Sequence, residues 1–366
     1  MKAVVQDRYG PADVLELSEI DRPVPGPGEV LVRVHAASVN AYDWHFMHGD
    51  PKLARGMMGL RAPRARVRGR DFSGLVEQVG AAITDLKPGD EVFGEADGAF
   101  AEYVCAPGGS VGPKPSNLTF EQAAAIPLAG NTALIGVRDV AAVRPGQSLL
   151  INGASGGVGT FAVQLGKAYG AEVTAVCSAR NAETARTLGA DHVIDYARED
   201  FTRAGLRYDA VLDLVGNHSL TAFRRAVTPA GRLVLSGGGV YEGGSLVGPM
   251  GLFVRRRLTA PFTRQRLLEL PAHQSKENLA ALKELAESGR LTPVVERTYP
   301  LSEAAEAIRY LEVEHAREGR RHRAGVTAPR GGLSPWPWRS PWPSRPRSRT
   351  RRPGRRPRPR RRARAG

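Results

Sequence analysis

A glycine-rich turn between an apolar strand and a helix constrains the fold of this chain more than any other feature. The turn reads Gly153-Ala-Ser-Gly-Gly-Val-Gly159, follows the apolar run 148–152, and leads into apolar residues at helical spacing through Tyr169. Backbone amides at such a helix N-terminus bind a pyrophosphate group. The G-x-x-G-x-x-G spacing departs from the commoner G-x-G-x-x-G, and a tight turn without a ligand is the alternative.

Strand-like runs follow at 172–177, 192–196, 209–215 and 231–235, with helical stretches between most of them. Strands that alternate with helices at this spacing predict a parallel, doubly wound sheet. The predicted fold class is therefore α/β with a Rossmann-type domain. In that context the glycine turn is interpreted as a dinucleotide site.

The residues on either side of this region predict a second, β-rich domain. Short apolar runs at 1–6, 29–36, 74–79 and 91–93 are separated by Pro and Gly turns, which is typical of Greek-key or barrel-like packing. After residue 258, the chain predicts a helix at 276–288, a strand at 294–299 and a helix capped by Ser302. These later elements indicate a return to the β-rich domain.

The end of the run 172–177 discriminates between nicotinamide cofactors. An Asp or Glu at this point accepts the ribose 2′-hydroxyl of NAD, whereas a 2′-phosphate needs a cation. The chain reads Cys177-Ser-Ala-Arg-Asn181 and has no acidic residue before Glu183. Ser178 and Arg180 therefore predict NADPH, and a solvated arginine on an exposed loop is the alternative.

The formal charge of +15 is concentrated at the C-terminal end. Residues 318–366 hold 17 Arg, no Lys and one acidic residue, which leaves a net charge of −1 on residues 1–317. We therefore expect no nucleic-acid partner for the folded part and predict that 318–366 is disordered. Two cysteines without a metal-binding spacing, no apolar leader and no membrane-length apolar run favour a reducing, cytoplasmic location.

Ordered motifs in residues 1–317 resemble the zinc-free quinone oxidoreductase branch of the medium-chain dehydrogenase/reductase superfamily. They are Ala37-Ser-Val-Asn-Ala-Tyr-Asp43, Gly69-Arg-Asp-Phe-Ser-Gly74, Lys87-Pro-Gly-Asp-Glu-Val92, Ile126-Pro-Leu-Ala-Gly-Asn-Thr-Ala133, the glycine turn, Leu188-Gly-Ala-Asp-His-Val-Ile-Asp-Tyr196 and the stretch Tyr310–Arg317. The resemblance implies a GroES-like catalytic domain at 1–125, a Rossmann domain at 126–262 and a return to the catalytic domain at 263–317.

The resemblance also implies a function, the transfer of a hydride from NADPH to a quinone or an α,β-unsaturated carbonyl by a homodimer. Asn40 and Arg70 stand where zinc-dependent relatives place a Cys and a His ligand, so no metal is expected. A specialised enoyl or alkenal reductase remains an alternative. So does a cofactor-binding regulatory or structural protein with little turnover.

Candidate site residues follow from the same resemblance. Those expected to contact the cofactor are Asn40, Asp43 and Thr132 at the nicotinamide, Ser155, Gly156, Gly157 and Val158 at the pyrophosphate, Ser178, Arg180 and Tyr196 at the adenosine phosphate and ribose, and Val215, Gly216, Ser236 and Gly237 in the nicotinamide half. Tyr42 and His45 are the candidate catalytic proton donors, although packing is the stronger interpretation for each.

The segment 251–262 combines apolar residues with an arginine cluster. One interpretation is contact with a membrane surface or with an apolar quinone tail. The other, which we favour from sequence, is a surface connection between domains, because such mixtures are common in linkers.

The resemblance ends after Arg317. Family members finish with a sequence like Gly-Lys-Val-Val-Val-Thr, the last strand of the catalytic domain, whereas this chain continues Glu318-Gly-Arg-Arg-His-Arg323. The DNA string CGG GAA GGT CGT CGT CAC encodes Arg317 to His322. When the reading frame is shifted by one base, the same string reads GGG AAG GTC GTC GTC AC, which encodes Gly-Lys-Val-Val-Val and begins a Thr codon. We therefore predict a one-base deletion near the codon for Arg317. The competing interpretation is an Arg-rich tail that binds nucleic acid, with interleaved Trp336, Trp338 and Trp342.

Overall fold

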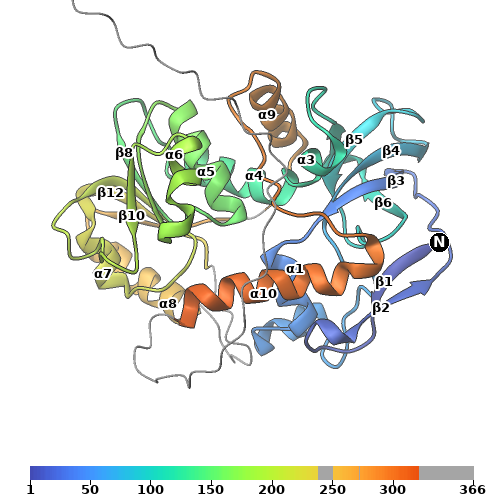
Figure 1. The fold of residues 1–366 in the computed structure, drawn as a ribbon, viewed down its shortest axis with the longest axis horizontal. Helices are drawn as coiled ribbons and strands as arrows, with labels where there is room; N and C mark the ends of the chain where they lie inside the picture. The colour runs from blue at the N-terminus through green and yellow to red at the C-terminus, as the bar shows by residue number, and fades with distance from the viewer. Residues whose placement is uncertain (238–249, 272, 321–366) are drawn as a thin grey trace, which may run out of the picture. The chain divides into compact units, whose positions relative to one another are not determined.

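The computed structural model describes residues 1–237, 250–271 and 273–320, with side chains described as far as Glu312 (Figure 1). The predicted tail at 318–366 therefore lies almost wholly outside the described residues. Among those residues, no helix is long and apolar enough to cross a membrane.

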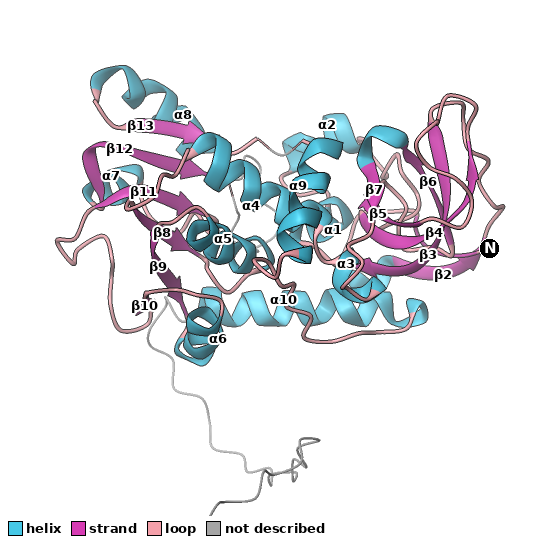
Figure 2. Cartoon of the chain, turned by 90° about the horizontal axis from the view of Figure 1, so that it is seen from above, coloured by secondary structure: helices cyan, strands magenta, loops and turns pink. Residues whose placement is uncertain are grey.

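A six-stranded parallel sheet forms the α/β part, in the order β10-β9-β8-β11-β12-β13 (Figures 1 and 2). Its strands are β8 (Ser148–Asn152), β9 (Glu172–Cys177), β10 (His192–Asp195), β11 (Tyr208–Asp213), β12 (Val227–Leu235) and β13 (Arg266–Glu269). The strand β13 extends this sheet beyond the predicted domain boundary at residue 262. The doubly wound fold class is confirmed.

Alternation along the strands explains how helices cover both faces of the sheet. In β8, Leu149 and Ile151 belong to one buried cluster and Leu150 to another, because successive side chains point to opposite faces. The helices of this part are α4 (Pro127–Leu134), α5 (Gly157–Ala168), α6 (Ala182–Thr187), α7 (Leu220–Arg225), α8 (Met250–Thr259) and α9 (Lys276–Glu287). The apolar side chains of α4, α5 and α9 lie in the cluster with Leu149, and those of α7 and α8 pack with Leu150.

The β-rich part holds a five-stranded antiparallel sheet in the order β6-β3-β4-β5-β7. Its strands are β3 (Glu29–Ser38), β4 (Asp71–Val79), β5 (Glu91–Glu95), β6 (Tyr103–Pro107) and β7 (Val111–Pro113), and a separate pair is formed by β1 (Lys2–Gln6) and β2 (Leu15–Glu19). Short helices follow at α1 (Ala41–His48), α2 (Arg55–Met58) and α3 (Phe120–Ala124). The expected β-rich domain is confirmed.

The last described helix, α10 (Ala304–Arg320), returns to the β-rich part. Its Ala304 and Ile308 share a buried cluster with Trp44 and Met47 of α1. The indole N–H of Trp44 also donates to Glu312 (2.9 Å).

Two predictions for the C-terminal region are wrong. The segment 294–299 is not a strand, because among the described residues no neighbouring backbone pairs with it; Val294 and Val295 remain 41% and 39% exposed. Ser302 does not cap a helix, since it lies inside a 3₁₀ turn, Leu301–Glu303, whose N-cap is Pro300. Regular α-helix begins only at Ala304.

Candidate functional site

The glycine-rich turn joins β8 to α5, as the sequence predicts. Gly153 has φ +90°, and a Cβ on Gly159 would lie 2.1 Å from the carbonyl oxygen of Gly153. These two positions therefore require glycine for backbone reasons. A Cβ on Gly157, by contrast, would meet only Ala129 at 3.8 Å. The N-terminus of α5 is thus open on the side where a phosphate would approach.

The end of β9 carries the residues expected at the adenosine phosphate. Ser178 and Arg180 follow Cys177, and Arg180 is exposed. The hydroxyl of Ser178 is buried and has no hydrogen-bond partner among the described residues. A buried hydroxyl in this state costs free energy unless a bound group satisfies it. The residues present therefore fit a phosphorylated ribose.

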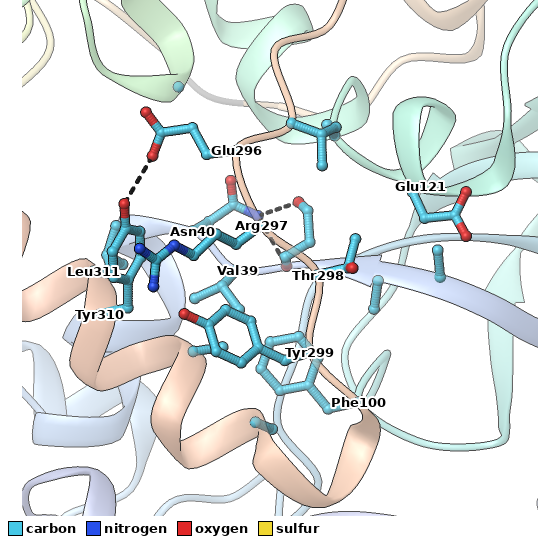
Figure 3. Close-up of a pocket in the computed structure, with 18 of the residues that line it drawn as sticks. Val39, Asn40, Phe100, Glu121, Glu296, Arg297, Thr298, Tyr299, Tyr310 and Leu311 are labelled. Carbon is cyan, nitrogen blue, oxygen red and sulfur yellow. Dashed lines mark hydrogen bonds between the residues drawn. The ribbon is translucent and has the colours of Figure 1, made fainter. Parts of the chain in front are cut away.

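A cavity of about 970 Å³ brings residues from both parts of the chain together. It includes five of the predicted site residues, namely Asn40, Ser155, Gly156, Gly157 and Arg180. Segment 294–299 and Tyr310 line the same cavity beside Asn40, and the hydroxyl of Tyr310 donates to Glu296 (3.1 Å) (Figure 3). The cavity therefore connects the glycine turn, Arg180 and Asn40 in one continuous space.

A buried polar network fixes Asn40 at the start of α1. The side-chain amide of Asn40 donates to Asp71 (3.1 Å), and its backbone N–H donates to Asp43 (2.8 Å). Asp71 also accepts the backbone N–H of Leu128 at 3.2 Å. Burial raises the pKa of Asp43 to about 7 and, together with the negative charge of Glu95, holds the pKa of Asp71 well above its ordinary value.

Arg70 occupies the centre of a charged cluster next to this network. Its guanidinium pairs with Asp97 (2.7 Å) and Glu95 (3.4 Å), and lies 5.0 Å over the ring of Tyr42. A cation at this point disfavours a metal ion by charge repulsion. Among the described residues, no group of three or more His, Cys, Asp or Glu side chains is arranged to hold a metal.

The two candidate proton donors differ in their surroundings. Burial raises the pKa of Tyr42 to about 12, and the phenol oxygen lies 3.5 Å from an Arg70 nitrogen. Burial lowers the pKa of His45, whose ring lies edge-on to Trp44. Tyr42 therefore keeps its proton at neutral pH, whereas His45 is neutral and lacks the extra proton of an imidazolium.

The remaining predicted residues lie outside the cavity lining. Asp43 is buried in α1, and Thr132 lies in α4. Gly216 and Gly237 both have positive φ (75° and 72°), which marks the sharp turns after β11 and β12. The other members of this set are Tyr42, His45, Val158, Ser178, Tyr196, Val215 and Ser236.

Some residues that line the cavity have no local sequence feature that marks them as site residues. Asn181 and Glu121 line the cavity, as does the whole of segment 294–299. Asp71, which does not line the cavity, belongs to the motif 69–74 and anchors Asn40. The spacing Gly69-Arg-Asp71 at the start of the strand β4 is the feature that points to it. The contribution of 294–299 depends on tertiary packing and has no local signature.

Fold and site together define a nicotinamide-dependent oxidoreductase built from a GroES-like domain and a Rossmann domain. Two family models match the chain, "Alcohol dehydrogenase GroES-like domain" over residues 26–116 and "Zinc-binding dehydrogenase" over residues 188–319. The chain belongs to the medium-chain dehydrogenase/reductase superfamily, as its motifs indicate, with quinone oxidoreductases among its relatives.

Three similar proteins illustrate the range. The chain is 35% identical to "NAD(P)H oxidoreductase RTN4IP1, mitochondrial" of Mus musculus, over 87% of each chain. It is 34% identical to "NADPH-dependent alkenal/one oxidoreductase, chloroplastic" of Arabidopsis thaliana, over 86% of this chain and 78% of the relative. The quinone oxidoreductase structure from Coxiella burnetii shares 32% identity and a TM-score of 0.75, covering 86% of this chain and 96% of that one.

Proposed function

We propose that this chain is a zinc-independent reductase that uses NADPH to reduce a quinone or an α,β-unsaturated carbonyl. One observation carries the proposal. The open glycine turn at 155–157, the cation Arg180 and the anchored amide of Asn40 line a single cavity. These groups suit, in order, a pyrophosphate, a 2′-phosphate and a carboxamide-bearing ring.

The preference for NADPH rests on charge at the end of β9. Arg180 lines the cavity, and the nearest acidic residue along the chain, Glu183, has a side chain 86% exposed and within 3.8 Å of Arg186. A carboxylate that would accept a ribose 2′-hydroxyl is therefore missing from the stretch 178–182.

Zinc independence rests on what occupies the two ligand positions. Asn40 is hydrogen-bonded to Asp71, and Arg70 is held by Glu95 and Asp97. We expect less than stoichiometric zinc by elemental analysis, and activity that chelators do not change. About one zinc per chain would refute this part of the proposal.

NADPH, when bound, supplies the hydride, and the protein residues orient the reactants and provide a proton. Tyr42 is the proposed proton donor, because burial keeps its phenol protonated and Arg70 lies close enough to stabilise the phenolate left behind. Since Tyr42 lies outside the cavity lining, this role requires the acceptor to reach α1 from the Asn40 end of the cavity. Tyr42→Phe removes the proton but keeps the ring stacked on Phe46, whose centroid lies 4.0 Å away. We expect the variant to bind NADPH normally while reducing enones more slowly.

Conjugated acceptors fit a site without a Lewis acid, because the added hydride leaves charge that spreads over an enolate or an aromatic ring. Relatives named as quinone and alkenal/one oxidoreductases support this class. Steady-state oxidation of NADPH across a panel of quinones, enones and enoyl thioesters tests it and separates the enoyl or alkenal alternative. Tight NADPH binding without turnover on any acceptor would favour a regulatory or structural role.

A homodimer and a cytoplasmic location remain predictions. In the described part of the chain, β13 pairs with β12 alone, and the carbonyl of its Leu267 accepts a hydrogen bond from Arg256 of α8. Light scattering after size exclusion measures the oligomeric state. Cell fractionation decides the location, since several relatives are named as mitochondrial or chloroplastic.

A further inference from the structure

The helix α8 presents an unusual outer surface. Val254, Leu258 and Phe262 recur every four residues along α8 and the turn that follows, and they are 54%, 68% and 88% exposed. Side chains spaced by four residues lie on one side of a helix. Val254 and Leu258 therefore share one side of α8, and Phe262 is exposed in the 3₁₀ turn that follows it. Three large exposed apolar side chains within nine residues, called the stripe here, are more than the isolated exposed residue that needs no explanation.

The opposite side of α8 is fixed to the protein. Leu252, Phe253 and Ala260 pack against the buried cluster of the sheet. Arg256 pairs with Glu269 (2.6 Å) and donates to the carbonyl of Leu267 (3.1 Å), which ties α8 to β13. The exposed stripe is thus not a consequence of a detached helix. Figure 2 shows α8 beside β13, at the outer end of the sheet.

The segment that carries the stripe is positively charged. Residues 250–266 contain five arginines and no acidic residue. Arg255, Arg257 and Arg264 are exposed, whereas Arg256 forms an ion pair with the nearby Glu269. The contrast with residues 1–317 as a whole, whose net charge is −1, makes this concentration local rather than general.

We propose that this surface, defined by Val254, Leu258 and Phe262 with Arg255, Arg257 and Arg264, docks on an anionic phospholipid membrane. A membrane interface offers both components that the surface requires. Its hydrocarbon boundary buries apolar side chains, and its phosphate headgroups pair with arginines at the same depth. The proposal does not depend on the identity of the substrate.

Charge excludes the other occupants. A second copy joined by a two-fold axis through this surface would bring the same arginines face to face. The C-terminal residues 318–366 hold 17 Arg and one acidic residue. This surface would therefore repel them as well. A nucleic acid matches the charge but has no apolar layer in which to bury Val254 and Leu258.

Vesicle titration of the full-length chain tests the proposal, with vesicles of phosphatidylcholine alone or mixed equally with phosphatidylglycerol. The combined variant Val254→Ser, Leu258→Ser, Phe262→Ser is expected to bind mixed vesicles at least about tenfold more weakly than the unmodified chain. The variant Arg255→Gln, Arg257→Gln, Arg264→Gln should lose a similar factor on mixed vesicles. The control for the serine variant is Val24→Ser, which replaces an apolar residue that is 81% exposed elsewhere. The control for the glutamine variant is Arg186→Gln combined with Arg203→Gln, because both arginines have acidic partners.

Every variant retains residues 318–366. The contribution of this segment to vesicle binding is therefore the same in all of them and cancels in the ratio of two vesicle affinities. Unchanged binding by the serine variant overturns the proposal, as does equal binding to vesicles of phosphatidylcholine alone. If the unmodified chain instead self-associates and only the serine variant is monomeric, the surface binds a second copy of the chain and the proposal of membrane docking is wrong. Melting temperature and NADPH binding of each variant verify that the fold is intact.

Discussion

At the residue scale, side-chain identity predicts which groups would contact the cofactor, but it does not predict how each of them is buried. The order Cys177-Ser-Ala-Arg180 suffices to suggest a 2′-phosphate. That the hydroxyl of Ser178 is buried without a partner among the described residues depends on how β9 and its neighbours pack. The same holds for Asp71, which contacts Asn40 from another strand.

Replacing Arg180 should separate the two cofactors. Arg180→Ala is expected to weaken NADPH binding by about tenfold to a hundredfold, because a hydrogen bond to a charged group contributes about 1.5–3 kcal/mol. NADH binding should change little. Arg186→Ala, a nearby arginine whose neighbour Glu183 lies 3.8 Å away, is the matched control. Calorimetric titration measures both affinities, and equal affinities in the unmodified chain would refute the assignment of NADPH.

Burial of Asp43 predicts a specific pH dependence of stability. Its pKa is raised by burial from 3.8 to about 7 in the folded chain, so the folded state holds more protons than the unfolded state between these values. Stability from this group therefore falls as pH rises from about 4 to 7. Asp43→Asn removes the titration and keeps an oxygen that accepts the N–H of Asn40.

The melting temperature of Asp43→Asn, relative to the unmodified chain, should consequently rise between pH 5 and pH 8. Buried carboxyls that do not interact with Asp43, such as Asp213, titrate in both proteins and cancel in the difference. A difference in melting temperature that is constant over this range would show that Asp43 does not titrate there.

At the element scale, strands with strong local signals were predicted well, whereas some short edge strands were not. The strands β8 and β9 have the predicted bounds, because long apolar runs lie between clear turns. The strands β2 and β13 were missed, since each is short and partly exposed at the edge of its sheet. For segment 294–299 the sequence predicts a strand that the structure does not have, because a strand-like sequence forms no strand without a partner.

Two glycines of one turn should behave differently. Gly159→Ala places a Cβ 2.1 Å from the carbonyl oxygen of Gly153, so we expect a large loss of stability. Gly157→Ala has room within the protein, at 3.8 Å from Ala129, but narrows the open side of the turn. It should leave the melting temperature unchanged and weaken NADPH binding. Gly28→Ala, with nothing within 4 Å, is the neutral control. Equal melting temperatures for all three variants would contradict this account.

At the scale of the whole molecule, one side of β3 lacks a strand partner near its C-terminal end in the described part of the sheet. From Ala36 to Ser38, β3 pairs with β4 alone among the described residues. Both the end of β3 and segment 294–299 line the cavity, and Val294 and Val295 are substantially exposed. Two backbone segments that lack partners and face one cavity are what remains when an intervening strand is missing.

Restoring the predicted reading frame should fill that place. We expect a chain that continues Gly-Lys-Val-Val-Val-Thr-Ala-Pro-Ala after Arg317 to have a higher melting temperature and a higher soluble yield than the present chain. Burial of three valines contributes on the order of 1.5 kcal/mol each, and the total stability of a typical domain is about 5–15 kcal/mol. A chain simply truncated after Arg317 is the control, because it removes the arginines without supplying a strand. Melting temperatures of the three chains decide between the explanations. If truncation alone stabilises as much as restoration, removal of the charged segment is the cause and the missing strand is not; if neither change stabilises, the Arg-rich segment must be considered a functional part of the protein.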